Sequence, residues 1–415
     1  MPAAPRAVPA VTPFRIGLLG HGTVGAAFAA LLSDRAAEVE LATGMRPEVS
    51  GVLTRSRGNL DEVVAGADLV VEVMGGADPA REYVLRAIAA GRHLVTANKA
   101  LLSQHGEEVY DAARRHGVQL RFEAAVGGVV PVIRVIQETL AAAHVDRVHG
   151  IVNGTTNYNL TEMTRTGASY EDALRAAQAL GYAEADPSDD VSGRDAAAKM
   201  AILARLAFGA AVRLEDVSYE GIESLTGHDI AYARELGLSL KLVGTAEQVD
   251  GGVSVRVHPT FLFGAHPLAT VDGSFNAVTI ESPAITEITL SGPGAGGSQT
   301  ASAVLGDVVS AMIPPPTLPP PAVPRPLVTD VESAFYLHLE VADRPGVLAQ
   351  VAEILGLQGV SIKSVVQRGM GHDARLEMVA HRVLESKFLA AVDLIGRLEF
   401  LRSPPRVIRV IEETF

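Results

Sequence analysis

Apolar and polar residues alternate along the first third of the chain in a rhythm of strands and helices. Short apolar runs, such as FRIGLLG (14–20) and ADLVVEVMGG (67–76), precede alanine-rich stretches with helical spacing, such as AAFAALLSDRAAEVE (26–40). Runs that are apolar throughout are typical of buried parallel strands joined by crossover helices. We therefore predict an N-terminal α/β domain, doubly wound and Rossmann-like, over residues 1–145.

The pattern becomes more mixed in the middle third of the chain. GIVNGTTNYNL (150–160) places strand-like residues before a polar turn, and SVRVHPTFL (254–262) and NAVTIES (276–282) read as strands. Helical spacing covers roughly 169–180 and 194–208. This mixture predicts an α+β domain on a mixed or antiparallel sheet, over residues 146–312.

Proline occupies most positions of IPPPTLPPPAVPRP (313–326), which predicts an extended linker over 313–329. The tail that follows, 330–415, reads strand, helix, strand, strand, helix, strand. That βαββαβ order predicts a small independent ferredoxin-like domain.

Composition narrows the function classes. The 415 residues are 48% hydrophobic and 20% charged, which is typical of a globular chain of two to four domains. The absence of cysteine excludes disulfides, thiolate catalysis and cysteine-bound metals. A net charge of −13 argues against a nucleic-acid partner. Without a signal pattern or an apolar run of about 18 residues, we expect a cytoplasmic protein with no membrane partner.

The first strand leads into GLLGHGTVG, where Gly20, Gly22 and Gly25 have the G-x-G-x-x-G spacing. Such a turn lets a dinucleotide pyrophosphate approach the N–H groups at a helix start, although a glycine turn without a ligand is the alternative. After the second strand, GVLTRSRGN supplies Arg55 and Arg57 and no carboxylate. Two guanidiniums favour NADP over NAD, and a solvated basic loop is the alternative.

Five carboxylates and one lysine mark the segment GYAEADPSDDVSGRDAAAK (181–199). Lys199 follows Asp195 by one helical turn, so both side chains can face one site, or form only an intrahelical ion pair. The helix around them is apolar nearly all round, and a buried lysine with a shifted pKa suits a proton donor. Asp186 and Asp189 flank Pro187 and read as turn residues.

Together these motifs resemble homoserine dehydrogenase, in its long bacterial form with a C-terminal ACT domain. The resemblance covers nearly the whole chain and also rests on EVMGG, HLVTANKALL, FEAAVGGVVPVI, GPGAGGSQTASAVLGD and DRPGVLAQVAEIL. The family reduces L-aspartate 4-semialdehyde to L-homoserine with NAD(P)H, at the branch leading to threonine, isoleucine and methionine. Two other interpretations stay open: another small-substrate Rossmann dehydrogenase, or a sensor of nucleotides and amino acids that has lost the catalytic chemistry.

The resemblance implies a role for each matching residue. Lys199 corresponds to the catalytic acid/base, Asp195 to its substrate-binding partner and Lys99 to a lysine that touches cofactor and substrate, with Asn98 close by. The implied substrate-binding residues are Gly154, Thr155, Gly181, Tyr182, Glu184, Asp190 and Asp195. The implied cofactor-binding residues are Gly20, Gly22, Thr23, Val24, Gly25, Arg55, Arg57, Thr96, Lys99 and Gly297, the last on a segment, 292–312, that packs back on the first domain.

The resemblance also implies a structural sodium ion and a regulatory tail. Sodium would be held at Glu123, Val126, Gly128 and Val130, whereas on residues alone this segment reads as a glycine-rich hinge. The histidines form no cluster with metal-ligand spacing, so we expect neither zinc nor iron. Threonine is the implied effector of the ACT domain, but Ser361 stands where many ligand-binding members carry asparagine, which leaves a purely dimerising role open. We expect a homodimer or homotetramer.

Overall fold

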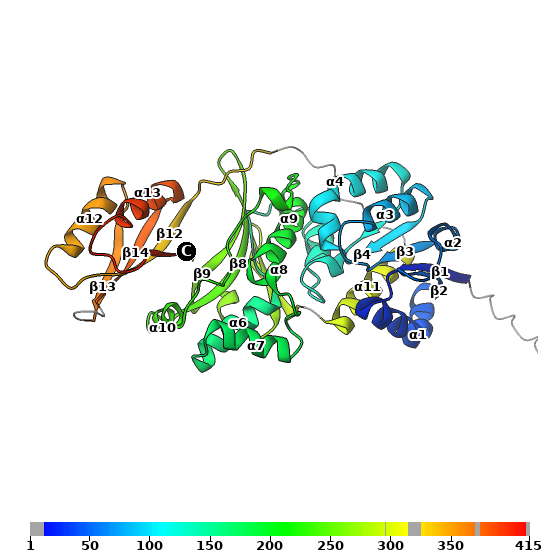
Figure 1. The fold of residues 1–415 in the computed structure, drawn as a ribbon. Coiled ribbons are helices and arrows are strands. Elements are labelled where there is room, and N and C mark those ends of the chain that lie inside the picture. The colour runs from blue at the N-terminus through cyan, green and yellow to red at the C-terminus, as the bar shows by residue number, and fades with distance from the viewer. Residues whose placement is uncertain (1–11, 295, 314–324, 370–373, 412–415) are drawn as a thin grey trace, which may run out of the picture.

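The computed structural model describes residues 12–294, 296–313, 325–369 and 374–411, in three regions that follow one another across the molecule (Figure 1). Most of the proline-rich stretch predicted as a linker lies outside these residues. Within the described ranges, no helix combines the length and apolarity needed to cross a membrane.

The first region is built on a five-stranded, entirely parallel sheet of order β2-β1-β3-β4-β5. Its elements are β1 (Thr12–Leu19), α1 (Thr23–Thr43), β2 (Met45–Leu53), α2 (Leu60–Ala65), β3 (Leu69–Glu72), α3 (Ala80–Ala89), β4 (His93–Thr96), α4 (Lys99–His116) and β5 (Leu120–Arg121). Ile16 and Leu18 pack towards α1 and α11 (Gly297–Met312), while Leu19 joins the core on the opposite face. Helices therefore cover both faces, and the predicted Rossmann-like fold is confirmed (Figure 1).

The sheet order places a topological switch at β1. The chain leaves β1 towards β2 on one side and later returns to β3 on the other. In open α/β sheets, ligands bind beyond the carboxyl ends of the strands at such a point. The glycine loop therefore begins where a ligand is expected.

A short irregular stretch connects the first region to the second: η1 (Glu123–Ala125), α5 (Val132–Arg134) and η2 (Val135–Thr139). The second region holds an antiparallel run of strands in the order β11-β10-β6-β8-β9. Its strands are β6 (Arg147–Ile151), β7 (Ser218–Tyr219), β8 (Leu238–Val249), β9 (Gly252–Phe263), β10 (Phe275–Ser282) and β11 (Thr286–Pro293). The mixed or antiparallel sheet predicted for the middle of the chain is present.

Helices of the second region gather on one face of its sheet (Figure 1). They are α6 (Gly154–Thr166), α7 (Tyr170–Ala179), α8 (Ser188–Val191), α9 (Arg194–Phe208) and α10 (Gly227–Glu235), with the short turn η3 (Leu214–Asp216). The turn η4 (Pro267–Thr270) packs with Ile151, Val243 and Leu262 on the other face. The helix α9 packs against β6, β8 and β9, and Ala197, Met200 and Leu203 on it are fully buried. A helix buried on nearly all sides is what its apolar sequence predicts.

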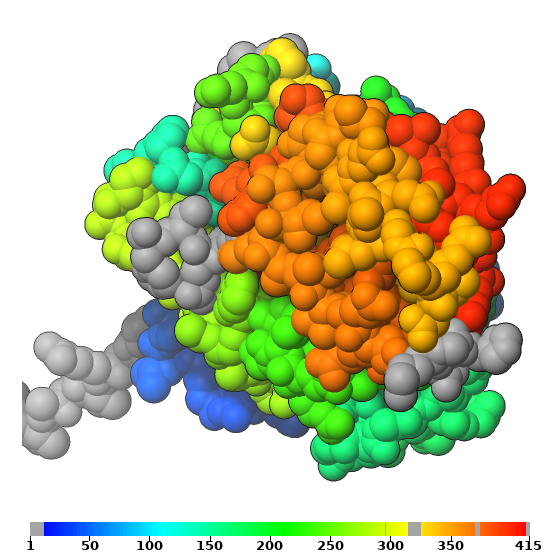
Figure 2. Space-filling view, turned by 90° about the vertical axis from the view of Figure 1, so that its left-hand side faces the viewer, coloured from blue at the N-terminus to red at the C-terminus, as the bar shows by residue number. Residues whose placement is uncertain are grey.

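The tail folds as predicted, into β12 (Glu332–Glu340), α12 (Val347–Leu357), β13 (Ile362–Arg368), β14 (Arg375–Leu384), α13 (Glu385–Ile395) and β15 (Arg406–Ile411). Its strand order, β15-β12-β14-β13, is that of a ferredoxin-like sandwich. Viewed from the tail side, these elements cover much of one end of the molecule (Figure 2).

The tail is joined to the second region by strand pairing, which differs from the expectation of an independent unit. β15 pairs in parallel with β9, from Arg409 opposite Thr260 to Ile411 opposite Leu262, so the two sheets are continuous. Both strands would otherwise expose unpaired edges, and joining them satisfies those backbone groups. A proline-rich stretch predicts an extended connection, but it does not indicate whether strands of the domains it connects will pair.

Candidate active site

A cleft between the first two regions brings together segments that lie far apart in the sequence. Its cavity of about 380 Å³ is lined by Val24 of the glycine loop, Lys99, Gly128, Glu184 and Lys199, among others. It opens beyond the carboxyl ends of β1, β3 and β4 and reaches the second region at α9. Four residues predicted for the cofactor or the substrate, Val24, Lys99, Glu184 and Lys199, therefore line one cavity.

Each glycine of the loop after β1 has its own steric reason. Gly20 has φ +100, and a Cβ there would lie 2.8 Å from the carbonyl oxygen of Val73. A Cβ on Gly25 would lie 2.2 Å from the carbonyl oxygen of Gly20, so the turn could not close. Gly22 has open space around it, which leaves the backbone at the start of α1 accessible. This arrangement fits a pyrophosphate at the helix N-terminus.

The segment 292–312 folds back against this loop. Its helix α11 runs beside α1, and Gly297 lies so close that a Cβ would be 3.0 Å from a methyl group of Thr23. The helix start of α1 carries no acidic residue, so its N–H groups are not already matched by a carboxylate there.

Arg55 and Arg57 follow β2 at the same edge of the sheet. The N–H of Gly20 donates to the carbonyl of Leu53 at 2.9 Å, which ties the glycine loop to the end of β2. Both arginines are exposed, and neither side chain makes an ion pair within the described part of the chain. They are therefore accessible to a charged group of a dinucleotide placed on the loop.

Two lysines share one buried carboxylate at the base of the cleft. Lys199 Nζ donates to Asp195 Oδ2 at 2.7 Å and to the carbonyl of Val152 at 2.7 Å. Lys99, the first residue of α4, forms an ion pair with Asp195 Oδ1 from the other region. The side chain of Asp195 is 2% exposed, against 13% for Lys199 and 44% for Lys99. The predicted pair on α9 is thus a three-residue cluster across the cleft.

The electrostatics of this cluster favour its charged state. Burial alone would raise the pKa of Asp195, but the ammonium groups of Lys199 and Lys99 lower it far below the usual range. Burial would lower the pKa of Lys99, and the attraction of Asp195 raises it instead. Asp195 therefore remains an anion that holds two cations at the cavity.

Asp190 lies beside this cluster with the opposite tendency. Burial and the nearby charge of Asp195 raise its pKa, partly offset by a hydrogen bond from Asn153 and by the two lysines. Asn153 Nδ2 donates to Asp190 Oδ1 at 2.7 Å, and Thr155 Oγ1 donates to the Tyr182 carbonyl at 2.7 Å. A cation placed beside a buried carboxylate with a raised pKa stabilises the charged form of that carboxylate.

The other residues predicted around the substrate lie on two segments, 181–184 and the start of α6, which contact each other through Thr155 and Tyr182. Glu184 is exposed and lines the cavity. Gly181 has φ +77, and the ring of Tyr182 packs 5.0 Å from that of Tyr158. Gly154 and Thr155 are the first residues of α6, where backbone N–H groups face outward from a helix start.

Asp186 and Asp189 have partners of their own, outside the cluster of Asp190 and Asp195. Asp186 accepts the N–H of Ser188 at 3.1 Å, as a turn-forming aspartate does, and Asp189 pairs with Arg194 at 3.1 Å. The acidic segment therefore divides into turn residues and residues of the cleft.

Sequence reasoning missed two residues that support the cleft. Glu72, at the end of β3, is fully buried and accepts from Thr96 Oγ1 at 2.6 Å and from Asn98 Nδ2 at 3.3 Å. Asn98 in turn caps α4 by accepting the Leu101 N–H at 3.0 Å, directly before Lys99. The second is Asn153, which contacts both Asp190 and Asp195. Glu72 stands in the EVMGG motif and Asn153 in NGTTN, but neither spacing indicates these contacts.

Glu123, the predicted sodium ligand, sits at the hinge between the regions. Its carboxylate accepts the N–H groups of Ile133 at 2.8 Å and Arg134 at 2.9 Å, and so caps α5. Burial, together with the charge of Asp307, raises the pKa of Glu123 to about 7. Val126 and Val130 are buried, and Gly128 packs against Gly294. Among the residues described, no group of three or more histidine, aspartate or glutamate side chains forms a metal cluster.

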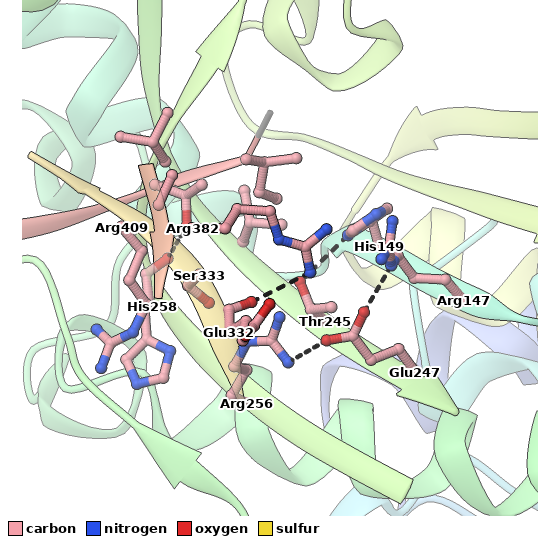
Figure 3. Close-up of a pocket in the computed structure, with 15 residues that line it drawn as sticks. Arg147, His149, Thr245, Glu247, Arg256, His258, Glu332, Ser333, Arg382 and Arg409 are labelled. Carbon is pink, nitrogen blue, oxygen red and sulfur yellow. Dashed lines mark hydrogen bonds and ion pairs between the residues drawn. The ribbon is translucent and has the colours of Figure 1, made fainter. Parts of the chain in front are cut away.

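A second, smaller pocket of about 60 Å³ lies where the tail sheet joins that of the second region (Figure 3). Arg147 and Arg256 both pair with Glu247, at 2.7 and 2.6 Å, and Arg409 pairs with Glu385 and Glu220. None of the predicted site residues lies here. We refer to this group of paired charges as the seam cluster.

A dinucleotide loop facing a lysine–carboxylate cluster across a cleft defines an NAD(P)-dependent dehydrogenase. Three family profiles match the chain: the NAD-binding domain of homoserine dehydrogenase at 20–123, homoserine dehydrogenase at 131–309 and the ACT domain at 336–400. The homoserine dehydrogenase of Synechocystis sp. is 40% identical, covering 96% of this chain and 99% of its own. That of Corynebacterium glutamicum is 40% identical, covering 95% of each.

Solved structures give the same result. A homoserine dehydrogenase from Thiobacillus denitrificans superposes with a TM-score of 0.92 at 38% identity, over 97% of this chain and 99% of that one. A hyperthermophilic archaeal homoserine dehydrogenase, solved in complex with NADPH, has a TM-score of 0.64 at 26% identity, over 74% of this chain and 100% of that one. The chain belongs to the homoserine dehydrogenase family, and it is an oxidoreductase with an NAD(P)-binding domain and an ACT domain.

Proposed function

We propose that the protein interconverts L-aspartate 4-semialdehyde and L-homoserine with NADP(H), and so serves threonine, methionine and isoleucine biosynthesis in the cytoplasm. The observation that carries this proposal is the shared carboxylate of Asp195, which holds Lys199 and Lys99 at one cavity with the glycine loop. Reduction of an aldehyde needs a proton donor and positive charge near the developing alkoxide, and these lysines provide both.

Each residue of the cluster has a distinct part in the reaction. When bound, the reduced nicotinamide supplies the hydride. Lys199 donates the proton to the substrate oxygen, and Asp195 orients Lys199 through the 2.7 Å hydrogen bond. Lys99 adds positive charge from the cofactor side of the cleft. In the reverse direction Lys199 accepts the proton.

The polar ends of the substrate match the walls of the cleft. Glu184 and Asp190 present carboxylates to the substrate ammonium, and Gly181 and Tyr182 form the turn beside them. The substrate carboxylate meets N–H groups of Gly154 and Thr155 at the start of α6, where a helix favours an anion.

Exposed guanidiniums support NADP over NAD. Arg55 and Arg57 follow β2, where a 2′-phosphate on the adenosine ribose would lie, and no carboxylate stands there for a 2′-hydroxyl. Thr23 and Val24 belong to the glycine loop, and Gly297 packs against Thr23. Thr96 Oγ1 accepts the N–H of Asn98, the residue before Lys99. The archaeal relative solved with NADPH agrees with this choice.

We propose that a sodium ion binds at this hinge, held by Glu123 and the carbonyls of Val126, Gly128 and Val130. Glu123 uses one acceptor site on each carboxylate oxygen for α5, which leaves further lone pairs for a cation. Asp307 nearby adds a second buried carboxylate that a cation would stabilise. Replacing sodium by choline should lower the midpoint of thermal unfolding, and an unchanged midpoint would overturn this assignment.

The tail supports a regulatory role. An ACT domain continuous with the sheet of the second region can transmit the binding of an amino acid, and threonine, the end product, is the proposed effector. The alternative role is assembly alone, into a homodimer or homotetramer. Threonine added during turnover distinguishes the two, because only a sensing tail changes the rate.

The decisive experiment follows NADPH oxidation by the purified protein with aspartate semialdehyde. We expect turnover at a rate on the order of 10 s⁻¹, typical of such enzymes. No turnover with the unmutated chain, under either NADPH or NADH, would overturn the proposed function. Turnover with other small aldehydes but not with this one would point to a different dehydrogenase.

A further inference from the structure

One asparagine at the end of β6 contacts both carboxylates of the cleft. Asn153 is 4% exposed, and its Nδ2 donates to Asp190 Oδ1 at 2.7 Å and to Asp195 Oδ2 at 2.8 Å. Its Oδ1 accepts the Thr156 N–H at 2.9 Å and caps α6. The amide oxygen of Asn153 thus caps α6, and the amide nitrogen donates to both carboxylates of the cleft.

The adjacent backbone holds the proton donor. The carbonyl of Val152 accepts from Lys199 Nζ at 2.7 Å. Two successive residues, Val152 and Asn153, therefore fix Lys199 and both aspartates relative to the end of one strand. Because β6 lies in the centre of the sheet, between β10 and β8, this reference point is rigid.

We propose that Asn153 is a positioning residue, which keeps Asp190 ionised and turned towards the substrate ammonium while Asp195 stays with the two lysines. This inference rests on the proposed function. Without the amide, the two carboxylates would face each other with only the lysines between them.

The surroundings of Asp190 give this role a measurable consequence. The groups that face it are Asp195 and Lys199 from α9, Lys99 from α4, and the neutral side chains of Asn153 and Thr155. Burial and Asp195 raise the pKa of Asp190, whereas Asn153 lowers it. Loss of the amide therefore raises this pKa further. Asp190 then protonates at a higher pH and no longer attracts an ammonium.

Asn153→Ser isolates the donor, because serine also caps a helix and brings no charge. We measure homoserine oxidation with NADP⁺ between about pH 6 and 10. KM for homoserine should rise about tenfold on the acidic limb of the profile, with a smaller change in kcat. The acidic limb of kcat/KM should move up by roughly one pH unit. An unmoved limb in a folded variant would overturn the proposal.

Two further variants separate positioning from stability. Asn157, one turn along α6, is also buried and donates to the carbonyls of Val271 and Phe275 at 3.0 and 3.1 Å. Asn157→Ala should lower thermal stability without moving the limb. In an Asp190→Asn background, Asn153→Ser should no longer shift it, and a shift that persists would contradict action through Asp190.

Calorimetry of homoserine binding keeps the test independent of turnover. Affinity in the unmutated protein should fall as the pH drops through the pKa of Asp190, and Asn153→Ser should show the same fall at higher pH. If the unmutated chain binds homoserine with this profile but does not turn it over, only the proposed function fails. If the unmutated chain and Asn153→Ser share one pH profile of homoserine affinity, only the role of Asn153 fails.

Discussion

The active-site cleft and the seam cluster contain the same kinds of charged residue in different proportions. In the seam cluster, Glu247 is shared by Arg147 and Arg256, and burial, which would raise its pKa, is outweighed by the two guanidiniums. Arg147 has Glu281 as a second partner at 3.3 Å. In the cleft, Asp195 is matched by two lysines, but Asp190 beside it has a raised pKa.

This difference separates a structural charge network from a reactive one. Each buried charge of the seam cluster gains from its neighbours, so the pairs around Glu247 stabilise the second region. The pair of Arg409 with Glu220 crosses its junction with the tail. In the cleft, Asp190 is ionised at a cost that a bound ammonium would remove. The cavity on that side is open to the substrate, and Lys199 faces it as well.

The largest effect that this comparison predicts is on the rate. Lys199→Ala should lower kcat for aspartate semialdehyde reduction about a thousandfold, because the proton donor is removed. Steady-state NADPH oxidation measures it, with Lys387→Ala, an exposed lysine of α13, as the matched control that keeps the full rate. If Lys199→Ala keeps its rate while Lys99→Ala loses it, the proton donor is Lys99.

Next in size is the effect of breaking the seam cluster. Glu247→Ala leaves Arg147 and Arg256 without their shared partner, which should lower the free energy of unfolding by about 3 kcal/mol. Thermal unfolding measures the loss, and kcat and KM of the folded enzyme should stay unchanged. Glu332→Ala, at an exposed carboxylate of the same pocket, should change little. A fall in kcat with stability intact would make the seam cluster part of the catalytic machinery.

The same comparison shows what could be predicted from the sequence. Lys199 and Asp195 are one helical turn apart, and the glycine spacing is local, so both were predictable. The contact of Lys99 with Asp195 joins α4 to α9, and Asn153 reaches Asp190 across the site. Such contacts depend on how distant elements pack, and a single asparagine after a strand has no distinctive pattern. The pairing of β15 with β9 was missed for the same reason.

A smaller effect is expected at the cofactor end of the cleft. Arg55→Ala and Arg57→Ala should each raise KM for NADPH about tenfold, because a charge-assisted hydrogen bond to the 2′-phosphate is lost. KM for NADH should stay the same, since NADH has no such phosphate. Arg35→Ala, an exposed arginine of α1, is the matched control. Equal changes in KM for NADPH and NADH would show that the arginines do not bind the 2′-phosphate.

The smallest effect tests the comparison most directly, because the two aspartates of the cleft should respond with opposite signs. The folded pKa of Asp190 lies above its unfolded value, so stability falls as pH rises through that range and stays lower above it. Asp190→Asn should therefore raise the free energy of unfolding at pH 7 by about 1 kcal/mol, while KM for homoserine rises. The gain should shrink as the pH falls through the pKa of Asp190, where the unmutated carboxyl takes up its proton. Asp195→Asn should destabilise instead, because Lys199 and Lys99 lose their common anion. A loss of stability in Asp190→Asn would place Asp190 with Glu247, as a charge that holds the fold together.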